Sequence, residues 1–227
     1  MSGKFCTTHP DQEAQVKDKA DRQAIIDACL QMNVSGLNQG TSGNISVRSG
    51  DGILITPTAL PYDRMTPQDI VRMGFDGNTD GARAPSSEWR FHLDIMRAKP
   101  DKGAVVHAHP HACTVLAILG KPIPPLHYMV AAAGGHDIAV APYATYGTAE
   151  LSAHALAALT DRHACLLAHH GMIATGATLQ KAMWLAVEVE TLAKQYLACL
   201  PFGEPPLLSV EEIARVRARF EGYGIQD

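Results

Sequence analysis

The chain has 227 residues, of which 46% are hydrophobic and 19% charged, as expected for a globular protein with a substantial core. Its formal net charge of -4, with acidic and basic residues interspersed, provides no basic stripe for nucleic acid. The least charged stretch, residues 103–148, is interrupted by charged residues, prolines and a Gly-Gly pair, which excludes a membrane span there.

The first residues and the cysteines bear on the cellular compartment, and the lack of repeats and linkers bears on the number of domains. Residues 1–11 are polar and lack the apolar core of a secretion signal. The five cysteines are odd in number and form no Cys-x-x-Cys pair, a pattern that favours reduced thiols. We therefore expect a cytoplasmic protein. No repeat, low-complexity segment or long linker divides the chain, so we expect one domain over residues 1–227.

Apolar spacing and turn signals predict helices and strands that intermix along the chain. In chain order we expect a helix at 11–32, strands at 43–48 and 52–56, a helix at 89–98, a strand at 103–109, a helix at 111–119, a strand at 140–143, a helix at 149–159, a strand at 164–169, and helices at 178–200 and 209–221. Helix 178–200 is apolar nearly all round, which suggests burial beyond one subunit. Because strict βαβ alternation is absent, we expect an α/β fold with a mainly antiparallel sheet between helical layers.

Three histidines stand where apolar runs end. His107 and His109 close the predicted strand 103–109, and alternate residues of a strand share a face, so both can reach one ion. His170, at the end of another apolar run, would complete three neutral nitrogen ligands, the arrangement in which a catalytic zinc keeps one position open. An isolated histidine on an apolar strand is more often hydrogen-bonded structure than a ligand, and this chain has 11 histidines. The metal hypothesis therefore depends on other residues of the chain that would accompany these histidines.

That support comes from Glu88, which follows two serines at the start of the predicted helix 89–98. Three polar loops, residues 40–44, 56–59 and 86–87, offer hydroxyls and backbone N–H groups that suit a phosphate. Each loop alone is more often a simple turn or helix cap. Together with Glu88 beside one of them, they suggest a substrate with a phosphate at one end and a metal-binding group at the other.

These motifs together resemble the class II aldolase/adducin family. The resemblance rests on residues 40–44, 55–58, 85–92, 105–109, 127–129, 131–135 and 169–171, which occur in the family's order over roughly residues 23–224. It implies a three-layer class II aldolase/adducin-like fold and a cytoplasmic homotetramer of fourfold symmetry with active sites at subunit interfaces. It also implies one zinc ion per subunit, for which manganese or cobalt could substitute.

The resemblance also implies residue roles. His107, His109 and His170 would bind the metal, Glu88 would be an acid/base that can also approach the metal, and His169 would not bind. The phosphate site would use Thr41, Asn44, Thr58, Ala59, Ser86 and Ser87. Ala59 stands where close relatives have glycine, which we expect to be tolerated only if its backbone N–H makes the contact without a positive φ.

Four aromatic residues complete the implied site. Tyr128 would reach in from a neighbouring subunit as the acid/base at the aldehyde oxygen. Tyr146, where a close relative has phenylalanine, would line the wall that touches the tail of the aldehyde. Phe220 and Tyr223 match aromatics that close over the site, with ordinary packing as the alternative for both.

The implied reaction is the reversible cleavage of a ketose 1-phosphate, such as L-fuculose 1-phosphate, into dihydroxyacetone phosphate and an aldehyde such as lactaldehyde. Alternatives are an aldolase acting on 5-deoxyribulose 1-phosphate or 5-(methylthio)ribulose 1-phosphate, a pentulose-phosphate 4-epimerase, and a 5-(methylthio)ribulose-1-phosphate dehydratase. A non-catalytic adducin-like interaction module is the least favoured, because all three ligands and Glu88 are present. The sequence does not separate the two kinds of aldolase.

Overall fold

A central eight-stranded sheet organises the molecule. The structure is a computed structural model that describes residues 10–80 and 83–220. Its elements are α1 (Pro10–Val34), β1 (Asn44–Ser49), β2 (Gly52–Ile55), η1 (Tyr62–Arg64), η2 (Pro67–Asp69), β3 (Val71–Gly74), β4 (Thr79–Asp80), α2 (Trp89–Ala98), β5 (Ala104–Ala108), α3 (His111–Ile118), η3 (Tyr128–Ala133), β6 (Val140–Ala141), α4 (Ala149–Ala158), β7 (Ala164–Leu167), β8 (Gly171–Gly176), α5 (Leu179–Cys199), η4 (Leu200–Phe202) and α6 (Val210–Phe220).

The strand order is β4-β3-β2-β1-β5-β8-β7-β6. Every neighbouring pair is antiparallel except β6 and β7, which run parallel and are connected through α4. The prediction of a mainly antiparallel sheet is therefore confirmed. β5 lies in the middle of the sheet, and all five of its residues are buried.

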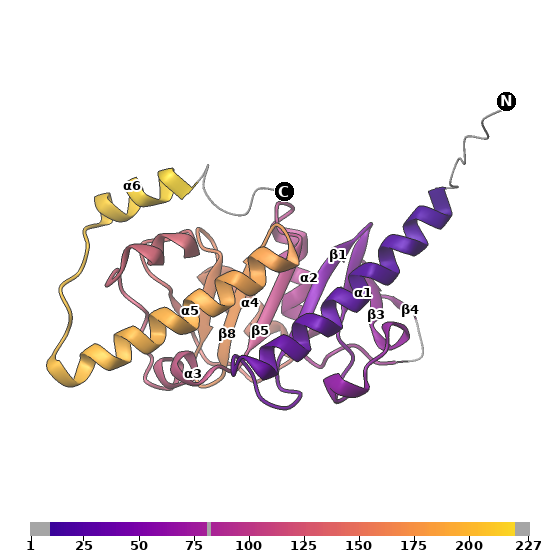
Figure 1. Ribbon diagram of the computed structural model, residues 1–227, viewed down its shortest axis with the longest axis horizontal. Helices are drawn as coiled ribbons and strands as arrows, with labels where there is room; N and C mark the ends of the chain where they lie inside the picture. The colour runs from indigo at the N-terminus through magenta and orange to yellow at the C-terminus, as the bar shows by residue number, and fades with distance from the viewer. Residues whose placement is uncertain (1–9, 81–82, 221–227) are drawn as a thin grey trace, which may run out of the picture.

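Helices cover both faces, as the period-2 alternation of the central strands requires. Val106 and Ala174 belong to the apolar cluster that includes residues of α1, α3 and α5, whereas Val105 and Ile173 belong to the cluster of α2 and α4. Figure 1 shows the long helices α1 and α5 lying across one face of the sheet. This gives three layers, helix, sheet and helix, with a core on each side of the sheet.

Several boundaries differ from the prediction. β3, β4 and β8 were not expected, and the predicted strand 164–169 ends at Leu167 because His169 adopts a positive φ of 56° and the chain turns into β8. β8 begins and ends with glycine, which reads as loop in a sequence, yet its position between β5 and β7 buries all six of its residues. β6 is also shorter than predicted, with two residues instead of four.

The two C-terminal helices match their predictions in part. On α5, Trp184 and Val187 keep 43% and 42% of their surface exposed, so within one chain the helix is not buried all round. The Ser209 hydroxyl accepts the backbone N–H of Glu212 at 3.1 Å, which is one half of a capping box, while the Glu212 carboxylate binds Arg215 instead. Glu221, the predicted end of the last helix, lies outside the described residues.

Two further observations concern membrane-spanning helices and cysteines. Within the described residues, no helix combines the length and apolar character that crossing a bilayer needs. Cys29, Cys113, Cys165 and Cys199 are free thiols.

Candidate metal centre

His107 and His109 are placed by the central strand and its exit. His107 lies in β5 and is fully buried, and His109 follows the strand, directly before the proline that precedes α3. The two rings point to the same side, as the alternation argument predicted, with their centroids 4.8 Å apart. The His107 Nδ1–H group donates to the backbone carbonyl of Met172 at 2.9 Å, so a neutral His107 presents its Nε2 lone pair to the site.

His170 comes from the turn between β7 and β8. Because β8 pairs with β5 in the register Ala108↔Met172, the residue two positions before Met172 lies at the end of β5, where His109 emerges. Gly171 makes this approach possible: a Cβ at position 171 would lie 2.5 Å from the carbonyl oxygen of Ala108 and 2.7 Å from the His109 ring. The His170 ring centroid is 4.8 Å from those of His107 and His109.

Glu88 is placed by the start of α2, which lies on the face of the sheet to which His107 points. It is the residue before the first helical residue rather than a member of the first turn, and its backbone N–H donates to the Ser86 hydroxyl at 3.3 Å. Its side chain is buried. Glu88 Oε2 lies 3.1 Å from His107 Nε2 and accepts a hydrogen bond from the side-chain amide of Asn44 at 3.0 Å, and Glu88 Oε1 lies 3.2 Å from His170 Nε2.

One ligand atom from each of these four residues falls within 4.8 Å of the others, which is close enough to hold one cation. The structure offers a direct test of that fit. A neutral His107 presents its Nε2 lone pair to the Glu88 Oε2 acceptor at 3.1 Å, and Glu88 Oε1 is buried with no hydrogen-bond donor among the described residues. Convergent lone pairs and an unsatisfied carboxylate oxygen are costly in a buried site, and a divalent cation satisfies all of them. The residues therefore fit a metal ion.

The protonation states suit metal binding. Burial, reinforced by the nearby His107, lowers the pKa of His109 to about 3 and that of His170 to about 4. Both imidazoles are therefore neutral near pH 7, the form that binds a metal. Burial alone would raise the pKa of the Glu88 carboxyl, but His107, His170 and Asn44 outweigh burial and lower it, so Glu88 is a carboxylate.

A cavity of about 440 Å³ opens beside this cluster and collects most of the predicted site residues. Its lining comprises Thr41, Ser42, Gly43, Asn44, Pro57, Thr58, Ala59, Ser86, Ser87, Glu88, His109, Tyr143, Ala144, Tyr146, His169 and His170. All six residues predicted for the phosphate therefore line one cavity with Glu88, two of the histidines and Tyr146. Asn44, however, directs its side-chain amide to Glu88, so its predicted contact with a phosphate stays a prediction.

Ala59 corrects one expectation. Its φ is 54°, in the left-handed region, whereas we expected the alanine to be tolerated without a positive φ. A Cβ in this conformation costs roughly 1–2 kcal/mol, because it crowds the following carbonyl oxygen. The loop therefore keeps the backbone shape that suits glycine, and the alanine introduces strain.

Tyr143 lines the cavity although the sequence did not point to it, and His169, which was expected not to bind the metal, lines it as well. Tyr143 is 60% exposed, and its ring meets the His169 ring edge-on at 6.0 Å between centroids. The signal that was available is its position just after β6, three residues before Tyr146. His169 lines the cavity but lies outside the four-residue metal cluster, in line with its predicted non-binding role.

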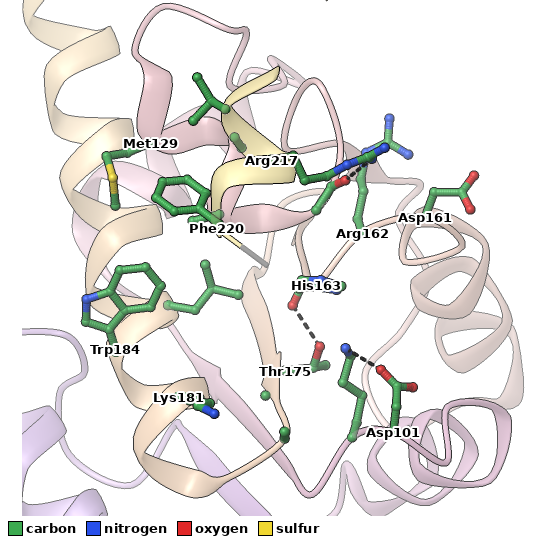
Figure 2. A pocket seen from close by; sticks show the side chains of 18 of the residues that line it. Asp101, Met129, Asp161, Arg162, His163, Thr175, Lys181, Trp184, Arg217 and Phe220 are labelled. Carbon is green, nitrogen blue, oxygen red and sulfur yellow. Dashed lines mark hydrogen bonds and ion pairs between the residues drawn. The ribbon is translucent and has the colours of Figure 1, made fainter. Parts of the chain in front are cut away.

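Tyr128 and Phe220 lie outside the cavity at Glu88. Both line a second, larger cavity of about 1340 Å³ beneath α6, and neither is among the residues that line the cavity at Glu88. Figure 2 shows Phe220 in this second cavity, near Met129 and Trp184. Tyr128 is 49% exposed. Tyr223 lies outside the described residues. A single chain therefore does not join Tyr128 to the metal cluster.

Comparison with known proteins gives consistent matches. The family model described as Class II Aldolase and Adducin N-terminal domain matches residues 23–197. A 5-methylthioribulose-1-phosphate/5-deoxyribulose-1-phosphate aldolase of Rhodospirillum rubrum is 59% identical over 203 residues, covering 89% of this chain and 92% of the relative. An L-fuculose phosphate aldolase of Escherichia coli K12 is 53% identical over 211 residues, covering 92% of this chain and 98% of the relative.

The fold is matched in the same way. A solved structure of an L-fuculose 1-phosphate aldolase superposes with a TM-score of 0.86 at 41% sequence identity, covering 88% of this chain and 95% of that one. An L-fuculose-1-phosphate aldolase from Thermus thermophilus superposes with a TM-score of 0.72 at 28% identity, covering 83% of this chain and all of that one.

Proposed function

The chain belongs to the class II aldolase and adducin family, and we propose that it is a metal-dependent aldolase that reversibly cleaves a ketose 1-phosphate into dihydroxyacetone phosphate and an aldehyde. The observation that carries the proposal is the cavity in which three hydroxyl-rich loops meet beside the four-residue cluster, three of whose members, Glu88, His109 and His170, line it. A non-catalytic interaction module would have no use for that combination. We also propose that residues 1–227 form a single domain.

The metal would be held by His107, His109 and His170, with Glu88 close enough to join them. Three neutral nitrogen ligands suit zinc, with manganese or cobalt as possible substitutes. When bound, the ion supplies a Lewis acid for the negative charge that develops on the C2 and C3 oxygens of the substrate.

The phosphate would bind at the three loops. Among the described residues, none forms a hydrogen bond with the hydroxyls of Thr41, Thr58 or Ser87, which leaves these groups available to a ligand. The N-terminal end of α2 adds a positive dipole beside Ser87. No lysine or arginine lines the described cavity, so hydroxyl and N–H groups would carry most of the phosphate binding.

Two proton transfers complete the reaction. In the synthetic direction the Glu88 carboxylate removes a proton from C3 of dihydroxyacetone phosphate, and in cleavage Glu88 in its protonated form donates a proton to C3. Tyr128 of the partner subunit would take the proton of the C4 hydroxyl while the C3–C4 bond breaks and its electron pair passes to the C2 carbonyl. This division of labour requires a homo-oligomer with interfacial active sites, which we propose to be a tetramer.

The substrate would be L-fuculose 1-phosphate or a similar ketose 1-phosphate. Relatives with 53% and 59% identity carry the names of aldolases for L-fuculose phosphate and for 5-methylthioribulose and 5-deoxyribulose 1-phosphates. These substrates share the half that becomes dihydroxyacetone phosphate and differ in the tail of the aldehyde. The second group is therefore the main alternative, and a pentulose-phosphate 4-epimerase is a more distant one.

The deciding experiment is an assay of dihydroxyacetone phosphate release by the zinc-loaded protein. The panel contains L-fuculose 1-phosphate, 5-deoxyribulose 1-phosphate and 5-(methylthio)ribulose 1-phosphate, with zinc-loaded Glu88→Gln as the inactive control. Release from at least one ketose is expected, and similar rates on all three would indicate an enzyme of broad range. Failure to release dihydroxyacetone phosphate from any of them would overturn the proposal, and C4 inversion of a pentulose phosphate would replace it with the epimerase.

A further inference from the structure

A buried chain of hydrogen bonds leads away from Glu88 and plays no part in the reaction described so far. Asn44 Nδ2 donates to Glu88 Oε2 at 3.0 Å, Asn44 Oδ1 lies 2.6 Å from His92 Nε2, and His92 Nδ1 lies 2.8 Å from the Ser46 hydroxyl. All four side chains are buried, and those of His92 and Ser46 are completely inaccessible. Burial of this many polar atoms is stabilising only if every one of them has a partner.

The position of these residues follows from the two elements that frame the site. Asn44 and Ser46 are two residues apart on β1 and therefore point to the same face of the sheet. His92 lies four residues after Glu88, which places both on one side of α2. Because Asn44 pairs with His107 across β1 and β5, the chain begins beside the metal cluster itself.

The direction of each hydrogen bond can be derived. A carboxylate only accepts, so the amide nitrogen of Asn44 must face Glu88 and its oxygen must face His92. That oxygen also only accepts, so His92 carries a proton on Nε2. Burial, reinforced by His107, lowers the pKa of His92 to about 3, so the ring has a single proton near pH 7. His92 Nδ1 is therefore an acceptor, and the Ser46 hydroxyl donates to it.

We propose that His92, held in its Nε2–H tautomer by Ser46, is a positioning residue that fixes the amide of Asn44 so that its N–H group, and not its oxygen, faces the Glu88 carboxylate. With the amide reversed, the Asn44 oxygen would lie next to Glu88 Oε2, and two acceptors at that distance repel each other. The carboxylate would then leave the orientation it needs for C3 of the substrate. The inference rests on the proposed function, because it assigns His92 a role in the proton transfer by Glu88.

The first test is independent of activity. Nitrogen-15 NMR of the histidine rings in the metal-free protein reports which nitrogen of His92 carries the proton. We expect the Nε2–H form in the wild type and a mixture of both tautomers in Ser46→Ala. The matched control is Ser152→Ala, which removes another buried serine hydroxyl, one that donates to Asp94 at 2.7 Å, and should leave the His92 signals unchanged. An Nδ1–H tautomer in the wild type would overturn the proposal.

The second test measures the exchange of the C3 proton of dihydroxyacetone phosphate with deuterated solvent. His92→Leu fills the space without hydrogen bonds, whereas His92→Gln retains a donor for the Asn44 oxygen. We expect His92→Leu to lower the maximal exchange rate about 10- to 100-fold, the usual effect of losing such a supporting contact, with zinc affinity and the KM for dihydroxyacetone phosphate nearly unchanged. His92→Gln should recover much of the loss.

Each outcome can be interpreted. Wild-type exchange in His92→Leu would mean that His92 only fills space. Equal losses of exchange in both His92 variants would mean that a hydrogen-bond donor to the Asn44 oxygen is not what matters at this position. Either result overturns the inference. If the wild type itself exchanges no proton, the proposed function fails instead. Should His92→Leu not fold, the tautomer measurement on Ser46→Ala still decides the question.

Discussion

The Nε2 atoms of His107, which is fully buried, and His109, which is partly buried, lie 2.9 Å apart. Since Nδ1 of His107 carries the proton that Met172 accepts, the facing Nε2 of a neutral His107 is bare. In the absence of a cation, His109 must donate to it and then has a single acceptable tautomer. With a cation, both nitrogens become ligands, so His109 Nε2 carries no proton and the ring takes the opposite tautomer.

The first prediction follows from this pair. His107→Ala, His109→Ala or His170→Ala should each lower metal affinity by at least the 10- to 100-fold typical of a lost supporting contact, since each removes a ligand outright. Elemental analysis after dialysis measures the bound metal, and chelation of the wild type should abolish cleavage. His169→Ala is the matched control, because His169 lines the same cavity outside the cluster. Full zinc occupancy in His170→Ala would remove that residue from the site.

The second prediction concerns Glu88. Glu88→Gln should keep the fold and most of the metal, because the three histidines remain. The amide cannot act as a base, so the exchange of the C3 proton of dihydroxyacetone phosphate should fall by about 10²- to 10⁴-fold. Exchange is followed by proton NMR in deuterated water. Near-normal exchange in this variant would assign the proton transfer to another group.

The third prediction separates the two proton transfers. Tyr128→Phe should depress carbon–carbon cleavage by about 10²- to 10⁴-fold, because the phenol is the proposed acid/base at the C4 oxygen. Exchange at C3 should stay largely intact, since in the proposed oligomer Glu88 and the metal cluster belong to the other subunit. Both rates are measured on the same zinc-loaded preparation. Equal losses of exchange and cleavage would indicate that Tyr128 supports the site as a whole.

The fourth prediction addresses the tail of the aldehyde. Tyr146 is 64% exposed in one chain and lines the cavity at Glu88. Tyr146→Phe should change the ratio of kcat/KM values between 5-deoxyribulose and 5-(methylthio)ribulose 1-phosphates and L-fuculose 1-phosphate, by a free energy of about 1–3 kcal/mol if a partner of the hydroxyl is left unpaired. An unchanged ratio would mean that the Tyr146 hydroxyl does not help to select the tail of the aldehyde.

The fifth prediction uses the strained alanine. Ala59→Gly should raise the free energy of unfolding by about 1 kcal/mol, because relief of the left-handed strain outweighs the extra freedom of the unfolded chain. In a chain of this size the melting temperature should rise by about 2–4 °C. Ala144→Gly is the control: Ala144 lines the same cavity without a positive φ, so glycine there should be destabilising. A lower melting temperature for Ala59→Gly would contradict the strain argument.

The sequence predicted those parts of the site that depend on local periodicity. The bounds of α2 matched, and the alternation of His107 and His109 followed from the strand alone. β8 could not be recognised, because its glycines are favoured by close backbone approach, as at Gly171, and not by strand propensity. The contact between Asn44 and His92 depends on how β1 packs against α2, which no spacing in the chain encodes.

The position of Tyr128 shows a different limit. Its likeness to a family motif suggested a role, but one chain places it in a separate cavity from Glu88. Assembly with another subunit would have to bring the two together, and the periodicity of a single segment does not predict assembly. The positive φ of Ala59 was missed for another reason, since the residue type argued against a conformation that the surrounding loop imposes.

The four side chains of the metal cluster come from the start of α2, from β5 and its exit, and from the β7–β8 turn, and they span residues 88 to 170. An ion held by all four would act as a non-covalent cross-link between the start of α2, the end of β5 and the β7–β8 turn, closing a loop of more than a third of the chain. Because only the folded chain brings these groups together, free zinc at about a thousand times its dissociation constant would add roughly 4 kcal/mol to the stability. Resistance to heat or proteolysis would then report whether the centre is filled, before any substrate is added.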